Sequence, residues 1–153
     1  MASELELIEL GSRAREFLAL DVSENQRGLV ATMAESYADA LFPEADENDP
    51  FVPWLRGVLR NGTPAGFIMC ADPINANSTP FLWRLLVDKA HQGFGVGRFA
   101  VTAALDRYRT MGFKKVSTSW SPRPGNPAGF YHAMGFIETG EINEGEVVAA
   151  IDL

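Results

Sequence analysis

The stretch Phe81–Met111 reads FLWRLLVDKAHQGFGVGRFAVTAALDRYRTM and holds the pattern that decides the fold. Its first part, Phe81–Val87, is a nearly continuous apolar run, which is typical of a central strand covered on both faces. Alternating glycines follow in Gln92–Gly97, and an alanine-rich segment with helical spacing then runs to about Met111, where Gly112 serves as a C-terminal cap. The stretch therefore predicts a buried strand, a glycine turn and a helix that packs on the same sheet.

The glycine turn Gln92–Gly97 has the chemistry of an anion site. Its three glycines stand at alternate positions, which frees the backbone to turn and removes side chains that would block a ligand. The exposed N–H groups of the turn and of the first helical turn, together with the helix dipole, suit a pyrophosphate, and Arg98 adds a positive charge. The alternative interpretation is a glycine-rich turn that only eases the packing of helix on sheet.

Two familiar phosphate-binding motifs do not fit this turn. A P-loop ends in Gly-Lys-Ser or Gly-Lys-Thr, whereas Gly97 is followed by Arg98 and Phe99. A dinucleotide fingerprint needs its third glycine where Arg98 stands, and an acidic residue about 20 positions further on, where the chain has Lys114 to Ser117. The pattern therefore belongs to another class of nucleotide site.

Turn and cap signals bound the other elements on both sides of this stretch. Asn61-Gly62 is the strongest of these signals, because this dipeptide favours the tight turn of a β-hairpin. The predicted elements are strands at Leu5–Leu10, Trp54–Leu59, Pro64–Ala71 and Lys115–Trp120, a helix that a Ser23–Gln26 capping box opens and that ends near Leu41, a short helix that Asn126 caps and Gly135 ends, and a hairpin of Phe136–Thr139 and Glu146–Leu153 with its turn at Gly140–Gly145. This order predicts an α+β (mixed α/β) fold in a single domain that spans residues 1–153.

The composition narrows the class of protein further. With 153 residues and 46% hydrophobic residues, the chain can form one ordinary globular core without staples. Cys70 is the lone cysteine, and its apolar neighbours favour buried packing over a role as a nucleophile. Cys70, His91 and His132 are scattered along the chain, so we expect no metal site. The acidic N-terminus lacks the pattern of a secretory signal, and 18 apolar residues never occur in succession, so we expect a cytoplasmic protein without a membrane partner.

Charge is distributed unevenly along the sequence. The net charge of −7 disfavours nucleic acid as a partner. Residues 84–123 hold eight of the 13 basic residues and two of the 20 acidic ones, whereas residues 124–153 hold five acidic residues and no basic one. A basic middle within acidic flanks suits a polyanion held centrally and a cation arriving from outside. Exposed faces that are simply solvated are the plainer alternative.

A second motif, Phe130-Tyr131-His-Ala-Met-Gly135-Phe136, follows the glycine turn after one further strand. The order of strand, Q-x-x-G-x-G, helix, strand and F-Y-x-x-x-G-F resembles the GNAT superfamily of acyl-CoA-dependent N-acetyltransferases over about Phe81–Phe136. The stretches Leu82–Val87 and Thr139–Glu141 are also similar to bacterial spermine/spermidine acetyltransferases. The resemblance implies a twisted, mostly antiparallel sheet of six to seven strands with about four helices, splayed at the acetyl-CoA site, and homodimers are frequent in the superfamily.

The resemblance also implies how the chain would hold acetyl-CoA, its acetyl donor. The pyrophosphate would lie on backbone N–H groups of Gln92–Arg98, and the pantetheine arm would pair with the strand edge near Leu85–Val87. The backbone N–H of Val87 would stabilise the oxyanion that forms on the thioester carbonyl, so Val87 counts as a catalytic residue. The residues expected to bind the cofactor are Leu85, Leu86, Val87, Gln92, Gly93, Phe94, Gly95, Val96, Gly97, Arg98, Asn126 and Tyr131. Asn126 has helix capping as a second interpretation.

The resemblance implies direct attack by a primary amine in a ternary complex, with Tyr131 as the general acid for the departing thiolate. A tyrosine, with a pKa of about 10, is protonated at neutral pH and can donate. The general base is not evident, because Leu82–Leu85 contains no carboxylate where many members of the superfamily carry a glutamate. A water chain, or Glu35 or Asp39 on one face of the first helix, could serve.

Electrostatics favours a small cationic amine, such as a polyamine, as the acceptor. The candidate residues of the acceptor site are Glu35, Asp39 and Trp83, the last as an aromatic wall for a cation. Three alternatives stay open, namely a protein or peptide N-terminal acetyltransferase, a non-catalytic acyl-CoA-binding module and a protein that binds another nucleotide.

Overall fold

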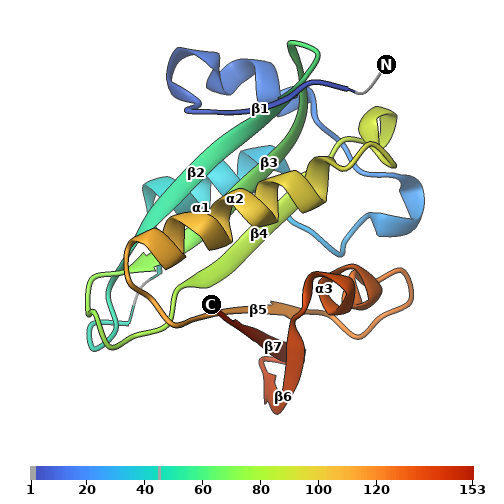
Figure 1. Cartoon of the computed structure of the whole chain (residues 1–153). Coiled ribbons are helices and arrows are strands. Elements are labelled where there is room, and N and C mark those ends of the chain that lie inside the picture. Colours follow the sequence, from blue (N-terminus) through green and yellow to red (C-terminus); the bar gives the residue numbers. More distant parts are fainter. Residues whose placement is uncertain (1–2, 45) are drawn as a thin grey trace.

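The computed structural model describes residues 3–44 and 46–153, and in this part of the chain seven strands form one sheet. The strands are β1 (Leu5–Ile8), β2 (Phe51–Arg60), β3 (Thr63–Pro73), β4 (Phe81–Val87), β5 (Lys115–Trp120), β6 (Ile137–Asn143) and β7 (Glu146–Asp152). Their order across the sheet is β1-β2-β3-β4-β5-β7-β6 (Figure 1). The pair β4·β5 is parallel and every other pair is antiparallel, which confirms the predicted mixed, mostly antiparallel sheet.

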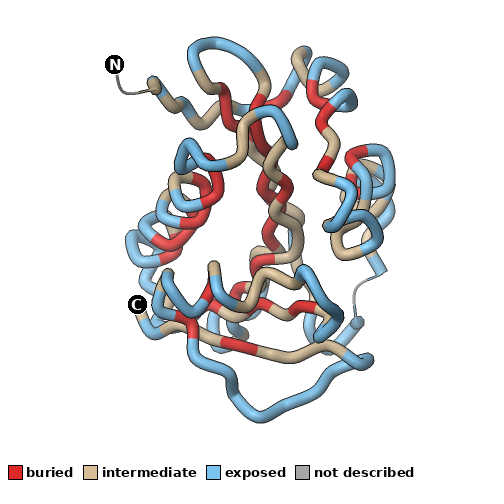
Figure 2. The backbone as a smooth tube through the Cα atoms, turned by 90° about the vertical axis from the view of Figure 1, so that its right-hand side faces the viewer, coloured by how far each residue is buried: buried red, intermediate tan, exposed pale blue. Residues whose placement is uncertain are grey.

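Helices cover both faces of this sheet. The helical segments are η1 (Gly11–Ala19), η2 (Glu24–Gln26), α1 (Met33–Leu41), η3 (Lys89–His91), α2 (Val96–Thr110) and α3 (Ala128–Met134), of which the η segments are 3-10 helices. The buried turns of α2 face the central strands (Figure 2). Val101, Leu105 and Tyr108 of this helix belong to the larger core cluster. The opposite face holds a second cluster, in which Phe17 of η1 and Met33 of α1 are buried.

The sequence misplaces the start of the first long helix. Ser23 precedes only the three-residue η2, and α1 begins ten residues later, at Met33. Thr32 and Glu35 form the capping box of α1, in which the Thr32 hydroxyl accepts from the Glu35 N–H and the Glu35 carboxylate accepts from the Thr32 N–H. Gly28 lies between the two segments with φ of +81°, a left-handed conformation that interrupts a helix. The nine-residue η1 has no counterpart among the predicted elements.

The C-terminal elements differ from the prediction at their ends. Strand β6 runs through most of the predicted turn, with an irregular register between Glu138 and Ile142, and the chain turns only at Glu144 and Gly145. Helix α3 begins at Ala128, and the Asn126 side chain accepts a hydrogen bond of 2.9 Å from the Ala128 N–H. The N-cap of α3 is therefore Pro127 and not Asn126 as predicted, and the Asn126 side chain instead holds the turn that leads into the helix.

Strands β4 and β5 part immediately after they meet. They pair only at Phe81–Ser117 and Leu82–Thr118, where the Thr118 hydroxyl donates to the Leu82 carbonyl at 3.0 Å. Trp83 is an extra residue on β4, because the neighbours Met69 and Cys70 of β3 pair with Arg84 and Leu82 (residues on either side of Trp83). Such a bulge bends a strand and increases its twist. Residues 83–87 thus have no partner strand on the β5 side, which confirms the expected splay of the sheet.

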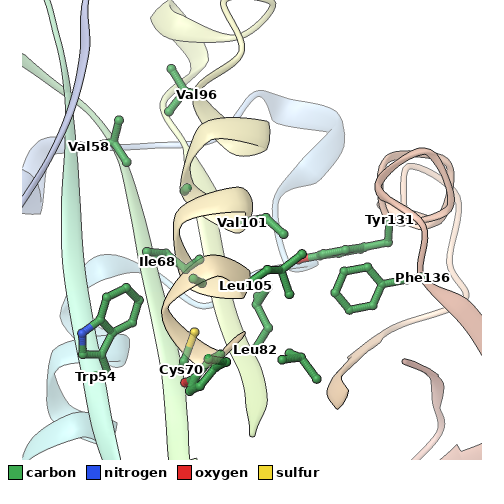
Figure 3. Packing of buried hydrophobic residues seen from close by; sticks show 14 of the residues in the cluster. Trp54, Val58, Ile68, Cys70, Leu82, Val96, Val101, Leu105, Tyr131 and Phe136 are labelled. Atoms are coloured by element: carbon green, nitrogen blue, oxygen red, sulfur yellow. The ribbon is translucent and has the colours of Figure 1, made fainter. Parts of the chain in front are cut away.

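Close packing fixes the glycine turn against the end of β4. A Cβ added to Gly66 of β3 would lie 2.6 Å from Cγ1 of Val96, the first residue of α2. Figure 3 shows Val96 at the start of α2, above Val101 and Leu105 on the same helix, which pack in the larger core cluster. The absence of a side chain at Gly66 lets the helix begin directly beside the open edge of β4.

Candidate active site

A cavity of about 480 Å³, here named the turn cavity, lies beside the open edge of β4. Its walls come from β4, the glycine turn, the start of α2, the segment before α1 and the segment around α3. The residues are Val22, Gln26, Leu29, Val30, Leu85, Val87, Gln92, Gly93, Gly95, Val96, Gly97, Arg98, Gly125, Pro127 and Phe130. Apart from Arg98, these side chains are uncharged, so a charged ligand would rely mostly on backbone groups and on this one guanidinium.

The glycine turn exposes its backbone to this cavity. Gly93 and Gly95 have φ of +83° and +80°, and Gly95 is the N-cap of α2. A Cβ on either glycine would meet no atom within 4 Å, so the space that these two side chains would fill is open. The N–H groups at the start of α2 have no helical partner and carry the positive end of the helix dipole. The turn therefore has the form of an anion site.

The backbone of β4 also faces the cavity at alternate residues. The Asp88 N–H donates to the Ala65 carbonyl of β3 at 2.9 Å, so this N–H points away from the open edge. Because the N–H and C=O of one residue point to the same side and successive residues alternate, the N–H and C=O groups of Val87 and of Leu85 point to the open edge. The Val87 carbonyl accordingly accepts from the Gln92 side chain at 3.4 Å. The Val87 N–H could therefore donate a hydrogen bond to the carbonyl oxygen of an acyl group that lies in the gap.

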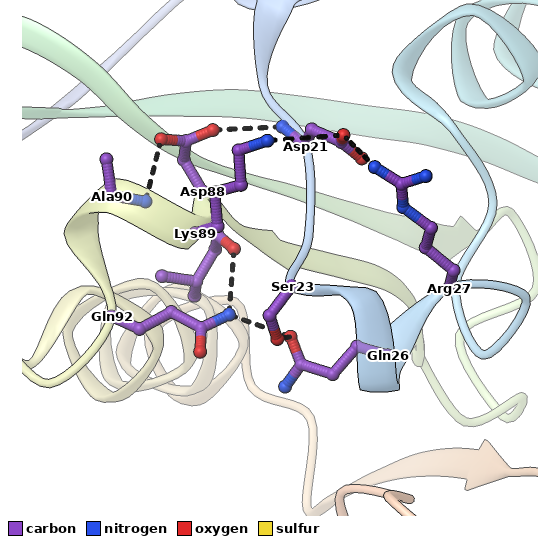
Figure 4. Close-up of polar contacts among 9 residues, drawn as sticks. Asp21, Ser23, Gln26, Arg27, Asp88, Lys89, Ala90 and Gln92 are labelled. Carbon is purple, nitrogen blue, oxygen red and sulfur yellow. Dashed lines mark hydrogen bonds and ion pairs between the residues drawn. The ribbon is translucent and has the colours of Figure 1, made fainter.

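A strap of chain, residues 21–30, forms another wall of the turn cavity. Figure 4 shows two of its ties, in which the Gln92 amide donates to the Gln26 side chain at 2.7 Å and the Asp21 N–H donates to the Asp88 carboxylate at 2.9 Å. A third tie runs from the Arg123 guanidinium to the Gly28 carbonyl. The strap contributes Val22, Gln26, Leu29 and Val30 to the cavity wall.

A second cavity of about 540 Å³, the tyrosine cavity, lies where β4 and β5 part. Its lining includes Leu82, Thr118 and Tyr131, together with the carboxylates of Glu35 and Glu146. Tyr131 extends from α3 toward Leu105 (Figure 3) and is only 5% exposed. Its ring is stacked on Trp120 of β5, with 5.6 Å between centroids and an angle of 4° between planes. This packing holds the phenol group at the point where β4 and β5 part.

Burial sets the protonation state of Tyr131. Loss of solvent raises the pKa of the Tyr131 hydroxyl well above its ordinary value of 10, and the Thr118 hydroxyl acts in the opposite direction to a smaller extent. The phenol is therefore protonated throughout the neutral range and can donate a proton. Cys70 is fully buried and belongs to the core, and burial raises the pKa of its thiol to about 12, so it has the packing role that the sequence predicted.

A third cavity of about 520 Å³, the acidic cavity, continues from the tyrosine cavity. Four carboxylates line it, those of Asp39, Glu44, Glu144 and Glu146, with Arg84 as the one cation among its lining residues. Arg84 is paired with Asp39 at 2.9 Å, which leaves three carboxylates without a cation in this wall. The Arg84 guanidinium also lies 5.3 Å over the Trp83 ring, so one face of this ring is already covered by a cation.

The three cavities adjoin one another in a row. The turn cavity and the tyrosine cavity share four lining residues, Leu29, Val30, Leu85 and Pro127. The tyrosine cavity and the acidic cavity share Trp83, Arg84, Ser119 and Glu146. The row runs along the open edge of β4, so a ligand at each end could meet the other beside Tyr131.

The structure gathers most of the residues that the sequence singled out. Leu85, Val87, Gln92, Gly93, Gly95, Val96, Gly97 and Arg98 line the turn cavity, Tyr131 and Glu35 line the tyrosine cavity, Asp39 lines the acidic cavity and Trp83 lines the latter two. Three residues lie outside these walls. Leu86 is buried in the core cluster under α1, Phe94 lies under the Arg60 guanidinium at 3.4 Å, and the Asn126 side chain accepts from the Ala128 N–H before α3.

Several lining residues are not evident from the sequence. The strap residues Val22, Leu29 and Val30 are ordinary apolar residues, and only the fold brings them to the glycine turn. Phe130 packs against the larger core cluster, and its ring, 3.4 Å from a Cβ built on Gly97, also forms part of the cavity wall. Ser119 and Glu146 come from two strands that pair only in the folded sheet. The second motif, with its tyrosine, was the one local signal for this region.

Within residues 3–44 and 46–153, no three His, Cys, Asp or Glu side chains come together in a way that could hold a metal ion. In the same part of the chain, no helix is long and apolar enough to cross a membrane.

The model of the acetyltransferase (GNAT) family matches residues 15–136, and the chain belongs to this family. It is therefore an acetyltransferase that takes its acetyl group from acetyl-CoA, the enzyme class and cosubstrate that the two motifs implied. Its relationship to spermine/spermidine acetyltransferases has no such support. A comparison with curated protein sequences finds no match.

Solved structures share the fold at low sequence identity. The PaiA N-acetyltransferase of Thermoplasma acidophilum, in complex with coenzyme A, is 14% identical over 100% of both chains, with a TM-score of 0.70. The GNAT domain of S. lividans PAT is 16% identical over 99% of this chain and 90% of that domain, with a TM-score of 0.73. The ribosomal-protein-S18-alanine N-acetyltransferase of Escherichia coli is 13% identical over 98% and 93%, with a TM-score of 0.66.

Proposed function

We propose that this enzyme transfers the acetyl group of acetyl-CoA directly to a primary amine of a small cation, such as a polyamine, in a ternary complex. The observation that carries the proposal is the row of three cavities, which joins an anion site built from backbone groups to a cavity walled by carboxylates. Tyr131 lies between the two sites. Because the two substrates can meet there, the acetyl group can pass directly to the amine, and no nucleophilic side chain is needed to carry it.

Acetyl-CoA would enter through the turn cavity. Its pyrophosphate would accept hydrogen bonds from the N–H groups of the Gly93–Gly97 turn and from Arg98, and its pantetheine arm would follow the open edge of β4 at Leu85–Val87. The solved relative from Thermoplasma acidophilum has coenzyme A bound on the same fold.

Two groups of this chain would then act on the thioester. The Val87 N–H, which points to the open edge, would stabilise the negative charge that develops on the carbonyl oxygen. The Tyr131 hydroxyl would give its proton to the departing sulfur. The raised pKa of Tyr131 keeps this proton in place throughout the neutral range.

The acceptor would enter from the acidic cavity. Three carboxylates without a cation in that wall favour a molecule with more than one positive charge, because each ammonium group adds its own attraction. Cation–π binding to Trp83 supports the proposal less than expected, because Arg84 already covers one face of its ring.

A panel of acceptors with acetyl-CoA tests the proposal through the release of free thiol. Spermidine and 1,4-diaminobutane should be acetylated with kcat/KM at least about tenfold above that of n-butylamine, and the difference should shrink in high salt because exposed charges are screened. Preference for a peptide N-terminus would instead identify a peptide acetyltransferase. Binding of acetyl-CoA without turnover of any amine would identify a non-catalytic module and overturn the proposal.

We propose the cytoplasm as the location of the enzyme, on the grounds of its lone buried cysteine. We also propose a homodimer, because homodimers are frequent in the family. Light scattering at assay concentrations should then give about twice the mass of the 16.7 kDa chain.

A further inference from the structure

Glu146 is a carboxylate at the border of two of the cavities. It is the first residue of β7, and it lines both the tyrosine cavity and the acidic cavity. The Ser119 hydroxyl of β5 donates to its Oε1 at 2.6 Å, and among the described residues Oε2 accepts no hydrogen bond. The next residue of the strand, Val147, pairs with Trp120, and the Trp120 ring is stacked on the ring of Tyr131. Glu146 is thus held beside the place where the acceptor would pass to reach the thioester.

Each of the other carboxylates of these two cavities either has a partner or lies outside the tyrosine cavity. Glu35, which also lines the tyrosine cavity, is exposed and accepts from the Thr32 N–H as part of the capping box of α1. Asp39 lines only the acidic cavity and is paired with Arg84 at 2.9 Å. Glu144 is exposed in the turn before β7 and lines the acidic cavity but not the tyrosine cavity. No histidine lines either cavity among the described residues.

We infer that Glu146, held in position by Ser119, is the general base that takes the proton from the acceptor ammonium group. The inference rests on the proposed acetyl transfer to an amine and supplies the base that is missing from the strand before the glycine turn. Ser119 is a positioning residue, because it acts on Glu146 and not on the substrate.

The protons and electron pairs balance as follows. Glu146 takes one proton from the ammonium group, and the nitrogen lone pair then forms the N–C bond at the thioester carbonyl. The C–S bond breaks with its electron pair on sulfur, which receives the proton of Tyr131. The nitrogen gives its second proton back to the Tyr131 oxygen, and Glu146 releases its proton to solvent, so that one proton leaves for each acetyl group transferred.

Two diamines separate a base from a merely structural or binding residue. At pH 8 both amines of 1,4-diaminobutane are protonated, whereas in 1,2-diaminoethane the nearby positive charge lowers the pKa of the second amine, so much of it is already free. Glu146→Gln keeps the shape of the side chain and can still accept from Ser119. This variant should lose about 10²-fold or more in kcat with 1,4-diaminobutane but less than about tenfold with 1,2-diaminoethane.

The control is Glu141→Gln, which removes the same charge from an exposed position on β6 outside all three cavities. Its activity ratio for the two diamines should equal that of the wild-type enzyme, and calorimetry should show unchanged acetyl-CoA binding in both variants. The pH dependence of kcat in Glu146→Gln should rise into the alkaline range, following the amount of free amine.

Two results would overturn the assignment of the base alone. The first is an active wild-type enzyme whose Glu146→Gln variant keeps its kcat and loses only acceptor KM, which would make Glu146 a binding residue. The second is an equal loss with both diamines, which would make it a structural residue. A wild-type enzyme that acetylates no amine would overturn the proposed function, and the base with it.

Discussion

The two ends of the row of cavities are built from different parts of the chain. The turn cavity is formed around backbone groups of one continuous stretch, from the end of β4 through the glycine turn to the start of α2. The acidic cavity is formed by side chains of α1 and the loop after it, of β4 and β5, and of the β6–β7 hairpin, elements that are distant in sequence. Backbone groups are present whatever the side chains are, whereas each carboxylate of the acidic cavity can be replaced by a single substitution.

This difference separates two kinds of specificity. A site of backbone N–H groups at a helix start recognises a phosphate in any chain that makes the same turn. A wall of carboxylates selects by charge and by the spacing of charges, so it can change from one enzyme to another without change of fold. We therefore expect the turn cavity to be sensitive to backbone geometry and the acidic cavity to be sensitive to salt.

The largest effect is expected where the two ends meet. Tyr131→Phe removes the hydroxyl but keeps the ring stacked on Trp120, so kcat should fall by about 10²–10³-fold while KM for acetyl-CoA changes little. Steady-state kinetics on thiol release measures both. Because burial raises the pKa of Tyr131, the wild-type rate should not decline through loss of this proton between pH 7 and its ordinary value of 10.

The matched control for that variant is Tyr37→Phe. The Tyr37 hydroxyl donates to the Ala14 carbonyl at 2.7 Å on the other face of the sheet, so its loss should cost about 1 kcal/mol in the free energy of unfolding and leave kcat unchanged. Equal kinetics for the two variants would show that Tyr131 is a packing residue. Tyr131 would then not be the general acid between the turn cavity and the acidic cavity.

The second effect tests the backbone site. Gly95→Ala places a Cβ in the open space of the turn at φ of +80°, so acetyl-CoA should bind about 10–100-fold more weakly by calorimetry. Gly112→Ala is the control, because Gly112 has φ of +92°, also meets no neighbour and lies beyond the other end of α2. Both variants should lose about 1–2 kcal/mol of stability from the left-handed conformation. Equal acetyl-CoA affinity in the two would contradict an anion site at the turn.

The same difference explains what could be predicted from the sequence. The turn cavity depends on local features, such as the apolar run Phe81–Val87, the glycine spacing and the Asn61-Gly62 hairpin, and each of these gave the correct element. The sequence also singled out Tyr131, which lines the tyrosine cavity, because it lies in a motif together with Gly135, which ends α3 in a left-handed conformation.

The rest depends on pairings that are distant in sequence. Glu146 comes beside Ser119 only because β7 inserts between β5 and β6, which no local pattern indicates. The strap was predicted as helix because Ser23 and Gln26 have the spacing of a capping box, but Gly28 and the ties to Gln92 and Arg123 hold it in an irregular path. Tertiary contacts outweighed local preference there.

The third effect tests the side-chain site. Glu44→Gln with Glu144→Gln removes two charges from the acidic cavity, so KM for a diamine should rise about 5–10-fold at low salt and less in 0.5 M salt, with KM for acetyl-CoA unchanged. The control pair Glu6→Gln with Glu141→Gln gives the same net charge from exposed positions outside the cavities. An equal rise in both pairs would mean that overall charge, and not this cavity, attracts the acceptor.

The smallest effect concerns the strap. In Gln26→Ala the Gln92 amide loses its acceptor at 2.7 Å and keeps only the longer contact of 3.4 Å with the Val87 carbonyl. One hydrogen bond of this kind contributes about 0.5–1.5 kcal/mol, so acetyl-CoA should bind about threefold to tenfold more weakly by calorimetry. Asn25→Ala on the same short helix also removes an acceptor from Ser23 but has no hydrogen bond to Gln92, and it should leave the affinity unchanged. The effect should stay small because the backbone N–H groups of the turn are intact in both variants. If Gln26→Ala instead weakened binding as much as Gly95→Ala, side chains of the strap would hold the ligand, and the turn cavity would be built in the same way as the acidic one.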